Sequence, residues 1–378
     1  MTRLGVVLRA TPASGGTYQY SLSMLEALVH SDRYDVTLYA DSSNPDLTQF
    51  PFPVRSFVEG RADQFRDLAA DALGMRGADP FPDQDVLIAP TFSLALLRTK
   101  KPFAYTLHDL QEFYHPTNFS WTQRAFRRRV HFRLADRAAG IICESKYVKS
   151  DIVRLLGVSG NKVSVVAAPP LSQPVAEFAD GQLAEIRDRL DLHGRFFFYP
   201  AQFWPHKNHL RLIEALRQVV AAEPGIKLVL TGKPRDEYDS VMQAVRRARL
   251  ERNVQHLGYI EQSDLQAIYH LAIALVMPSL FESVSIPIYE AFQAGTPVLA
   301  SDLLAIPEQV GTAGLLFDPL SSDSIAARML EIARDPGLAR KLGAQGRARM
   351  VAMTPQRYCN ELEALLASIT APGAIRKP

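Results

Sequence analysis

Two glutamates, Glu282 and Glu290, have seven residues between them and stand between two short apolar runs, 273–277 and 298–300. Pro287 suits a helix start and Gly295 a helix end, so the pattern predicts strand, loop, helix and strand. Such a loop lies at the carboxyl end of a parallel strand, where open α/β sheets bind ligands. Amides at a helix start bind anions, and carboxylates accept hydrogen bonds from sugar hydroxyls. The segment therefore predicts a site for a ligand that carries both phosphate and sugar.

The same segment resembles a known signature. Glu282-x7-Glu290, followed by A-x3-G-T-P-V, is similar to the donor site of the retaining, group 1 glycosyltransferases called family 4. The resemblance implies an α/β GT-B fold, with two Rossmann-like, doubly wound parallel-sheet domains facing a cleft. It also implies that Glu282 faces the donor sugar and that Glu290 binds the nucleotide ribose. The family's glycine-rich loop is replaced by Ser283, Val284, Ser285 and Ile286, whose backbone we expect at the donor.

A lysine follows the first predicted strand of the second half, in the segment QFWPHKN. The resemblance implies that Lys207 neutralises the donor pyrophosphate, on which negative charge grows in the transition state. The arginine usual in the family is replaced by Gln202 or Ala201. His206 or Lys233 could supply the second charge instead.

Two further turns follow predicted strands. The resemblance places Thr231, Gly232 and Lys233 near the phosphates, and Gly258 and Tyr259 around the nucleotide base. Ordinary βα turns without a ligand are the alternative for both.

In the first half, Gly15 and Gly16 stand at the start of a predicted helix and allow close approach of an anionic ligand, with a tight turn without a ligand as the alternative. His108 follows the predicted strand 103–107. The string HDLQEFYHPTNFS resembles bacterial transferases that build mannose- or rhamnose-containing polysaccharides, so His108 is expected beside the reacting sugar, with a loop histidine as the alternative.

Asp83 and Asp85 form a D-x-D motif, which in other sugar transferases holds a metal. They precede the predicted strand 86–89, at the end of the sheet opposite to the ligand edge. We interpret them as turn residues and predict no metal site. The only expected small molecule is the nucleotide-diphosphate sugar, as substrate and not as cofactor.

The chain has 378 residues and a net charge of +2, which suits two domains and gives no reason to expect nucleic-acid binding. Cys143 and Cys359 lie far apart without metal-ligand spacing. The first apolar run is too short for a signal peptide, and no run is long enough to span a bilayer. A cytoplasmic location follows as an expectation.

Alternation of apolar runs and helical patterns predicts parallel sheets in both halves. We expect an acceptor domain over 1–172, a donor domain over 173–353, and a final helix and tail, 354–378, returning to the first domain. A proline-rich linker is expected at 169–181. The predicted strands are 4–8, 36–39, 86–89, 103–107, 140–143, 163–167, 196–199, 226–230, 254–257, 273–277, 297–300 and 315–317. The predicted helices are 18–29, 121–135, 147–156, 210–222, 236–249, 263–272, 287–294, 322–334, 337–351 and 355–368.

One predicted helix is strongly basic. Its cationic side chains are Arg124, Arg127, Arg128, Arg129, His131, Arg133 and Arg137. The helix could lie on the anionic inner face of a membrane or meet a phosphorylated lipid acceptor. A solvated face above ordinary core contacts is the alternative.

The sequence thus predicts a retaining, metal-independent hexosyltransferase of bacterial polysaccharide synthesis. GDP-mannose is the favoured donor, with a UDP-sugar as the other choice, and the acceptor is a saccharide or a lipid-linked saccharide. A GT-B sugar-nucleotide epimerase and a non-catalytic GT-B scaffold are the alternatives. The oligomeric state is not predicted.

Overall fold

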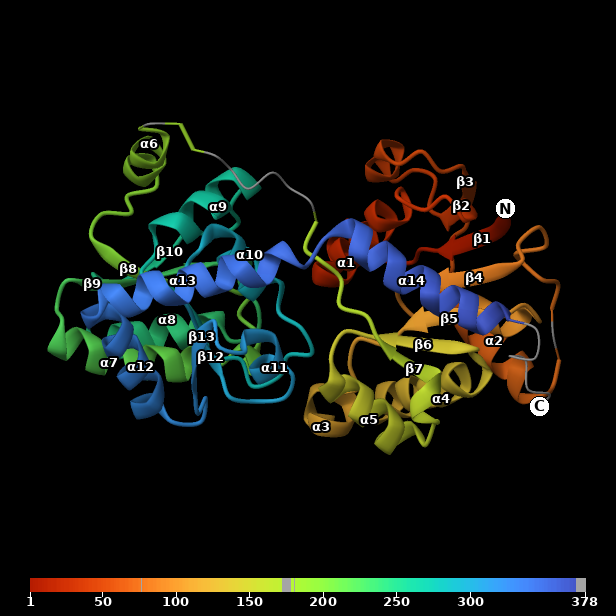
Figure 1. Ribbon diagram of the computed structural model, residues 1–378. Coiled ribbons are helices and arrows are strands. Elements are labelled where there is room, and N and C mark those ends of the chain that lie inside the picture. Colours follow the sequence, from red (N-terminus) through yellow and green to blue (C-terminus); the bar gives the residue numbers. More distant parts are fainter. Residues whose placement is uncertain (76, 172–177, 180, 372–378) are drawn as a thin grey trace. The chain divides into compact units, whose positions relative to one another are not determined.

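The computed structural model describes residues 1–75, 77–171, 178–179 and 181–371, which form two compact units (Figure 1). The first unit comprises Met1–Ser172 and Met353–Pro378, and the second comprises Gln173–Ala352. Most of the expected linker at 169–181, including its boundary at 172, lies outside the described residues, as does the tail after residue 371.

The first unit contains a seven-stranded parallel sheet in the order β3-β2-β1-β4-β5-β6-β7. Short apolar runs form its central strands because both faces are covered and each side chain is buried. The strands are β1 (Thr2–Val7), β2 (Tyr34–Ala40), β3 (Val54–Ser56), β4 (Val86–Ala89), β5 (Phe103–Thr106), β6 (Gly140–Cys143) and β7 (Val163–Val165).

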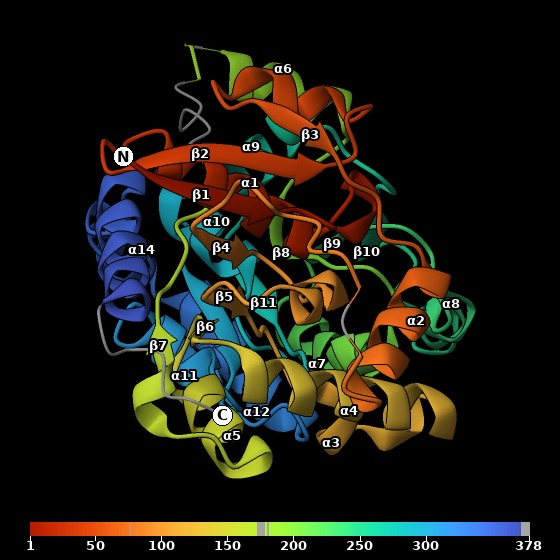
Figure 2. The same cartoon turned by 90° about the vertical axis from the view of Figure 1, so that its right-hand side faces the viewer.

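Alternate residues of these strands enter two separate cores. Ile88 and Ile142 pack in the core that contains α1 and α14, whereas Leu87 and Ile141 pack in the core of the opposite face. Figure 2 shows α14 on one side of the sheet and α2 and α4 on the other. The helices of this unit are α1 (Gly16–Leu28), α2 (Arg61–Ala72), α3 (Gln111–Tyr114), α4 (Trp121–Arg137), α5 (Lys146–Leu156) and α14 (Pro355–Thr370).

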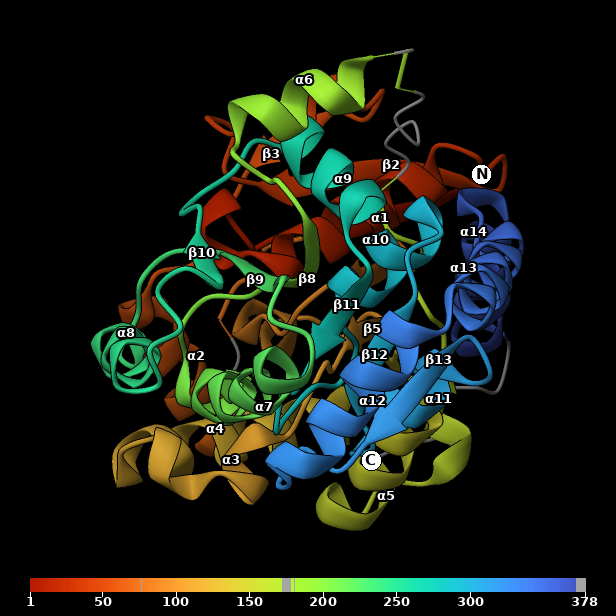
Figure 3. The ribbon, with the colours of Figure 1, turned by 90° about the vertical axis from the view of Figure 1, so that its left-hand side faces the viewer.

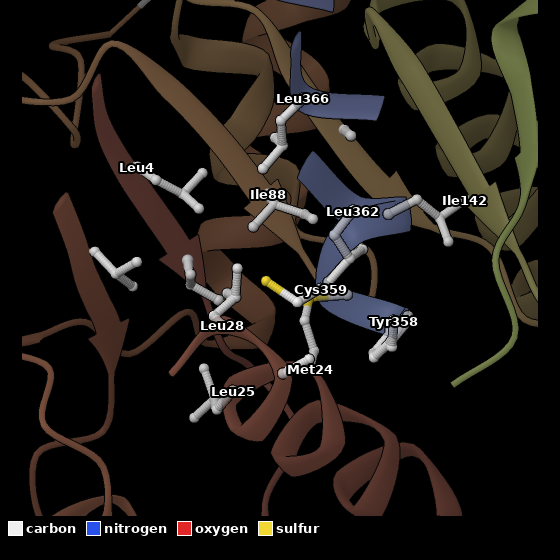
Figure 4. Packing of buried hydrophobic residues seen from close by; sticks show 14 of the residues in the cluster. Leu4, Met24, Leu25, Leu28, Ile88, Ile142, Tyr358, Cys359, Leu362 and Leu366 are labelled. Atoms are coloured by element: carbon white, nitrogen blue, oxygen red, sulfur yellow. The ribbon is translucent and has the colours of Figure 1, made fainter. Parts of the chain in front are cut away.

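The last helix, α14, packs against α1 although more than 300 residues separate them in sequence. Figure 4 shows Cys359 and Leu362 of α14 among Leu28 and Met24 of α1 and Ile88 of β4. Cys359 is a free, buried thiol, and its burial raises its pKa to about 11. The helix therefore completes the core of the first unit.

The second unit contains a six-stranded parallel sheet in the order β10-β9-β8-β11-β12-β13. Figure 3 shows α7, α8 and α12 on one side of this sheet and α9, α10 and α13 on the other. Its strands are β8 (Arg195–Pro200), β9 (Ile226–Thr231), β10 (Val254–His256), β11 (Ala274–Met277), β12 (Val298–Ser301) and β13 (Gly314–Phe317). Its helices are α6 (Gln182–Arg189), α7 (His209–Ala222), α8 (Tyr238–Arg247), α9 (Gln262–Leu271), α10 (Ile286–Ala294), α11 (Ile306–Val310), α12 (Ser322–Arg334) and α13 (Pro336–Val351).

Helix α10, which carries Glu290, is held by a close approach of α13. A Cβ atom at Gly343 would lie 2.1 Å from the carbonyl oxygen of Gly295, and one at Gly346 would lie 2.6 Å from the ring of Phe292. Only glycine permits this contact, which fixes α10 against its neighbour.

The strands expected from the sequence are all present within a few residues of their predicted bounds. Strand β3 and helices α2, α3, α6 and α11 were not predicted. No helix in the described part of the chain is both long and apolar enough to cross a membrane.

Candidate functional site

In the second unit the strand order reverses between β8 and β11. After β8 the chain adds β9 and β10 on one side of β8, and it then crosses to the other side, where β11 lies next to β8. Loops that follow such neighbouring strands diverge, and open α/β sheets bind ligands at this point. Lys207 follows β8 and Glu282 follows β11. The structure thus brings these two predicted residues to the same sheet edge.

Hydrogen bonds fasten the two loops to each other. The amide of Leu280 donates to the carbonyl oxygen of His206 at 2.7 Å, and Asn208 Nδ2 donates to the carbonyl oxygen of Pro278 at 2.9 Å. The buried Tyr199 hydroxyl donates to the carbonyl oxygen of Lys207 at 2.9 Å and lies 3.0 Å from Ser279 Oγ. Lys207 is therefore presented by a rigid backbone.

Lys207 and Glu282 form an ion pair through Nζ and Oε1. Their side chains keep 23% and 12% of their surface exposed, so a ligand can reach both. The cation and the carboxylate thus hold each other in place. A cation of this kind can bind phosphate, and a carboxylate can accept hydrogen bonds from sugar hydroxyls. His209, two residues after Lys207, is buried, and its ring stacks on that of Phe203 at 4.4 Å between centroids. Its burial and the Lys207 charge lower its pKa to about 3, so it is neutral at physiological pH.

The turns after β9 and β10 are bonded together at the same sheet edge. The amide of Gly232 donates to the carbonyl oxygen of Gly258 at 2.8 Å. Gly232 has φ of 113°, and a Cβ atom there would lie 2.7 Å from the carbonyl oxygen of Ala201 in the β8 loop. Glycine is required here, and Thr231, Gly232 and Gly258 form one continuous wall with that loop.

Two cations lie on this wall. Arg235 Nε donates to Gln202 Oε1 at 2.8 Å, and its guanidinium lies 5.2 Å from the ring centroid of Trp204. Lys233 Nζ lies 5.9 Å from the ring centroid of Tyr259, which is 78% exposed. The guanidinium of Arg235 therefore stands beside the position at which the resembled family usually has an arginine.

The loop before α10 is fixed by a glutamine from α11. Gln309 accepts from the amide of Ser285 at 2.9 Å and donates to its carbonyl oxygen at 2.7 Å. Ser285 Oγ contacts Met277 Sδ, so the polar groups of Ser285 are committed inside the unit. Gln309 therefore fixes the shape of the loop that contains Ser283 and Val284, although this loop has no glycine.

Glu290 lies in the second turn of α10 and is oriented from α9. The hydroxyl of buried Tyr269 donates to Glu290 Oε2 at 2.8 Å. The backbone carbonyl of Tyr269 accepts from Thr296 Oγ1 at 2.7 Å, which ties α9 to the turn after α10.

His108 belongs to the first unit and follows β5. Its Nδ1 lies 2.9 Å from Glu144 Oε2, and its Nε2 lies 3.0 Å from the carbonyl oxygen of Pro90. Burial alone would lower the pKa of His108, but the hydrogen bond and charge of Glu144, together with the Asp109 charge and the Pro90 carbonyl oxygen, outweigh it and raise the pKa. Both ring nitrogens face acceptors, so the geometry favours the doubly protonated imidazolium.

The glycine turn and the D-x-D motif also lie in the first unit. Gly15 has φ of 61° and caps α1, and Gly16 is the first residue of that helix; both are exposed. Asp85 is paired with Arg3 at 2.6 Å, and Asp83 with Arg55 at 2.7 Å. The D-x-D carboxylates therefore bind arginines at the amino end of β4.

The basic helix α4 divides its cations between interior and surface. Arg127 pairs with Glu112 at 3.0 Å, and Arg133 and Arg137 pair with Asp71 at 2.6 and 3.4 Å. Burial and the neighbouring Arg127 lower the pKa of His131 to about 3. The remaining outer face exposes Trp121, Arg128, Arg129 and Phe132.

Two family models match this chain in succession. Residues 14–168 match the model described as glycosyltransferase family 4, and residues 185–349 match the model described as glycosyl transferases group 1. The chain belongs to the group 1 glycosyltransferases of family 4. The second match contains Lys207, Glu282 and Glu290, and the first contains His108.

Among curated proteins, this glycosyltransferase is 30% identical to O-antigen chain mannosyltransferase B of Escherichia coli, over 65% of this chain and 64% of that protein's length. It is 25% identical to O-antigen chain mannosyltransferase RfbU of Salmonella typhimurium, over 80% of this chain and 83% of that one.

The fold also matches solved structures. Anabaena HepE in complex with UDP and glucose covers 97% of this chain and all of its own, with a TM-score of 0.77 and 21% sequence identity. At this identity the likeness confirms the GT-B fold and goes no further.

Proposed function

We propose that this glycosyltransferase moves a hexose from a nucleotide-diphosphate sugar to a saccharide or lipid-linked saccharide in bacterial polysaccharide synthesis. The observation that carries the proposal is the Lys207–Glu282 ion pair at the switch point of the second sheet. A phosphate would attract the ammonium while the carboxylate turned to the sugar hydroxyls.

The donor would lie along the carboxyl edge of the second sheet. Lys207 and Arg235 would bind the pyrophosphate, and Tyr259, with its exposed ring, would stack on the base. Glu290, oriented by Tyr269, would accept hydrogen bonds from the ribose.

The reaction replaces the bond between sugar C1 and the phosphate oxygen with a bond between C1 and an acceptor oxygen. The acceptor proton would pass to the leaving phosphate, whose growing charge Lys207 stabilises. We propose retention of the anomeric configuration, as the family resemblance implies. We propose, as the resemblance implies, that His108 lies beside the reacting sugar. Both of its ring nitrogens already face acceptors, Glu144 and the carbonyl oxygen of Pro90, so it would act through its positive charge and not as a base.

The donor is proposed to be GDP-mannose, because both curated relatives named above are mannosyltransferases. A UDP-sugar is the competing donor, since the HepE structure contains UDP and glucose. A thermal-shift screen with GDP-mannose, UDP-glucose and the free nucleotides separates the two. A donor at about 100 times its dissociation constant stabilises the folded protein by about 2.7 kcal/mol, which raises the melting temperature measurably.

Product analysis then tests the reaction class. NMR of the fresh product is expected to show the donor's own anomeric configuration, with activity unchanged by EDTA. An inverted product, or activity that EDTA abolishes and manganese restores, would contradict the proposal. Conversion of the nucleotide sugar without an acceptor would indicate an epimerase, and binding without turnover would indicate a scaffold.

We also propose that the outer face of α4 touches an anionic membrane surface. Trp121 and Phe132 are 74% and 43% exposed and lie eleven residues apart on the helix side that also carries Arg128 and Arg129. Aromatic rings beside arginines suit the interface of an anionic bilayer. A lipid-linked acceptor would be reached at such a surface, on the cytoplasmic side.

A further inference from the structure

The first unit contains a pocket of about 370 Å³ at the carboxyl edge of its sheet. Its lining comes from the segments that follow β1 and β2, from the start of α1, and from the segment after β3. The volume lies within the range of about 300–1,000 Å³ that is usual for small-molecule sites. Neither the donor residues nor His108 line it.

The polar wall of this pocket is organised by Tyr18. Its hydroxyl donates to Asp46 Oδ2 at 2.7 Å and accepts from Asn44 Nδ2 at 2.9 Å. Burial and the bond to Asp46 raise the pKa of Tyr18 to about 12, so it stays a neutral donor at physiological pH. The wall is therefore built before any ligand binds.

Two carboxylates of the wall each have one oxygen that accepts no hydrogen bond from the described residues. Asp46 Oδ1 and Asp41 Oδ2 accept no hydrogen bond within the described residues, whereas Asp41 Oδ1 accepts from the amide and hydroxyl of Ser43 at 2.9 and 2.7 Å. These bonds from Ser43 lower the pKa of Asp41. Ionised carboxylates with uncommitted oxygens are suited to accept hydrogen bonds from hydroxyl groups.

The charge of the lining distinguishes between ligands. Arg9 is the only cation among the described residues that line the pocket. Its guanidinium is paired with buried Glu59 at 2.8 Å and donates to the carbonyl oxygen of Phe92 at 2.8 Å. Neither Asp41 nor Asp46 forms an ion pair within the described residues of the lining. A phosphate there would be repelled by two carboxylates at short range.

The rest of the lining is apolar, with Leu22, Leu47 and Phe57 among its members. A pyranose has a carbon–hydrogen face and a rim of hydroxyl groups, which match an apolar wall and a carboxylate wall. We propose that this pocket binds an uncharged saccharide, the hexose end of the acceptor. Its assignment to the acceptor rests on the proposed transferase function, but its chemistry does not.

The test is saturation-transfer NMR on the full chain without donor. The probes are the methyl glycosides of mannose, rhamnose, glucose and galactose, with mannose 6-phosphate as the charged counterpart. At least one neutral glycoside is expected to bind, and mannose 6-phosphate at least ten-fold more weakly. Failure of all four glycosides to bind, or equal binding of the phosphate ester, would overturn the proposal.

Variants locate the binding. Asp46→Asn keeps a partner for Tyr18 but removes the charge, and a loss of affinity of about ten-fold is expected, as for a charge-assisted hydrogen bond. Val58→Trp places a large ring at the pocket, where Val58 is 69% exposed, and should abolish binding. Val54→Trp, on β3 and outside the lining, is the matched control and should bind as the unchanged protein does.

The saccharide-pocket proposal and the transferase proposal can be disproved independently. If both pocket variants bind glycosides normally and keep the acceptor KM unchanged while transfer continues, the pocket assignment is wrong and the transferase function stands. If glycosides bind in a manner that depends on Asp46 but no nucleotide sugar stabilises the protein, the pocket stands and the transferase function does not.

Discussion

The two sheets of this glycosyltransferase share a strand order but not the charge at their ligand edges. In each unit the chain starts in the middle of the sheet, at β1 or β8, builds outward to one side and returns to the other through β4 or β11. The edge of the second sheet offers Lys207, Lys233 and Arg235, whereas the pocket of the first has one cation, already paired with Glu59.

The same topology therefore supports two kinds of recognition. Backbone geometry places loops at the switch point of each sheet, but side chains decide which ligand is attracted. The second edge is suited to a phosphorylated ligand and the pocket of the first to a neutral one. Variants that change the charge at one edge should leave ligand binding at the other unaffected.

The largest effect is expected from Lys207→Ala. Lys207 is proposed to face the leaving phosphate, so its loss should lower kcat by about 100-fold or more, while glycoside binding to the first unit stays unchanged. Steady-state kinetics with the identified donor provide the measurement. Lys341→Ala, an exposed lysine of α13, is the control for loss of a positive charge. Full activity of Lys207→Ala would contradict the proposal that the edge of the second sheet binds a phosphorylated ligand.

Arg235→Gln is expected to weaken donor binding by about 10- to 100-fold, the value of one or two charge-assisted hydrogen bonds. The contact with Gln202 allows a swap, since the guanidinium and amide stand 2.8 Å apart. Gln202→Arg combined with Arg235→Gln should recover most of the affinity, measured by calorimetry with the donor nucleotide. If the single variant binds normally, Arg235 only packs on Trp204.

The central strands could be predicted because both sheet faces are covered. Runs such as Val86–Ala89 and Gly140–Cys143 are apolar throughout, and their bounds agree with the prediction. Strand β3 was missed because all three of its side chains are exposed and give no pattern. Helix α2 was missed because the residues that it buries, Gln64 and Asp67, are polar. Its buried face carries no hydrophobic periodicity.

The loops of the candidate site were predictable where their motifs are local in sequence. Glu282, Glu290 and Lys207 stand in motifs, and their loops are where the strand pattern predicts them. Arg235 and Glu144 were not predicted, because the contacts that bring them to the candidate residues Gln202 and His108 span 33 and 36 residues of sequence. The only local signal for Arg235 was a basic residue in a turn after β9, which many surface turns contain.

The pH dependence of kcat/KM should test the role of His108 in the first unit separately from donor binding by the second unit. Glu144→Gln preserves a hydrogen-bond acceptor for His108 Nδ1 but removes the charge that raises its pKa. Of the other groups near this ring, Asp109 would still raise the pKa, and Tyr20, in edge contact at 4.6 Å, is neutral. Because the unchanged protein holds the proton to higher pH, the alkaline limb of kcat/KM should move to lower pH in the variant.

Glu144→Asp should restore part of that shift, because it returns the charge with a shorter side chain. Donor affinity at low pH should be unaffected in both variants, since Lys207 and Glu290 belong to the second unit. An unchanged pH profile would mean that His108 has no role as a cation in the reaction.

The smallest effect on transfer is expected at α4, because its outer face would attach the protein to a membrane and would take no part in the reaction. Arg128→Gln with Arg129→Gln removes the two exposed cations and spares Arg127, which is paired with the fully buried Glu112. Each arginine near an anionic surface contributes about 1 kcal/mol to binding. The affinity for phosphatidylserine vesicles, measured by sedimentation, should therefore fall by roughly ten- to thirty-fold.

Arg246→Gln with Arg247→Gln is the matched control, since it removes two exposed adjacent arginines from α8 in the second unit. Binding of the unchanged protein should weaken as salt rises, because exposed charges are screened, whereas Trp121→Ala should weaken it at every salt concentration. If the α4 and α8 variants sediment equally with anionic vesicles, net charge alone explains the binding. The exposed aromatic and basic face of α4 would then be an ordinary solvated surface.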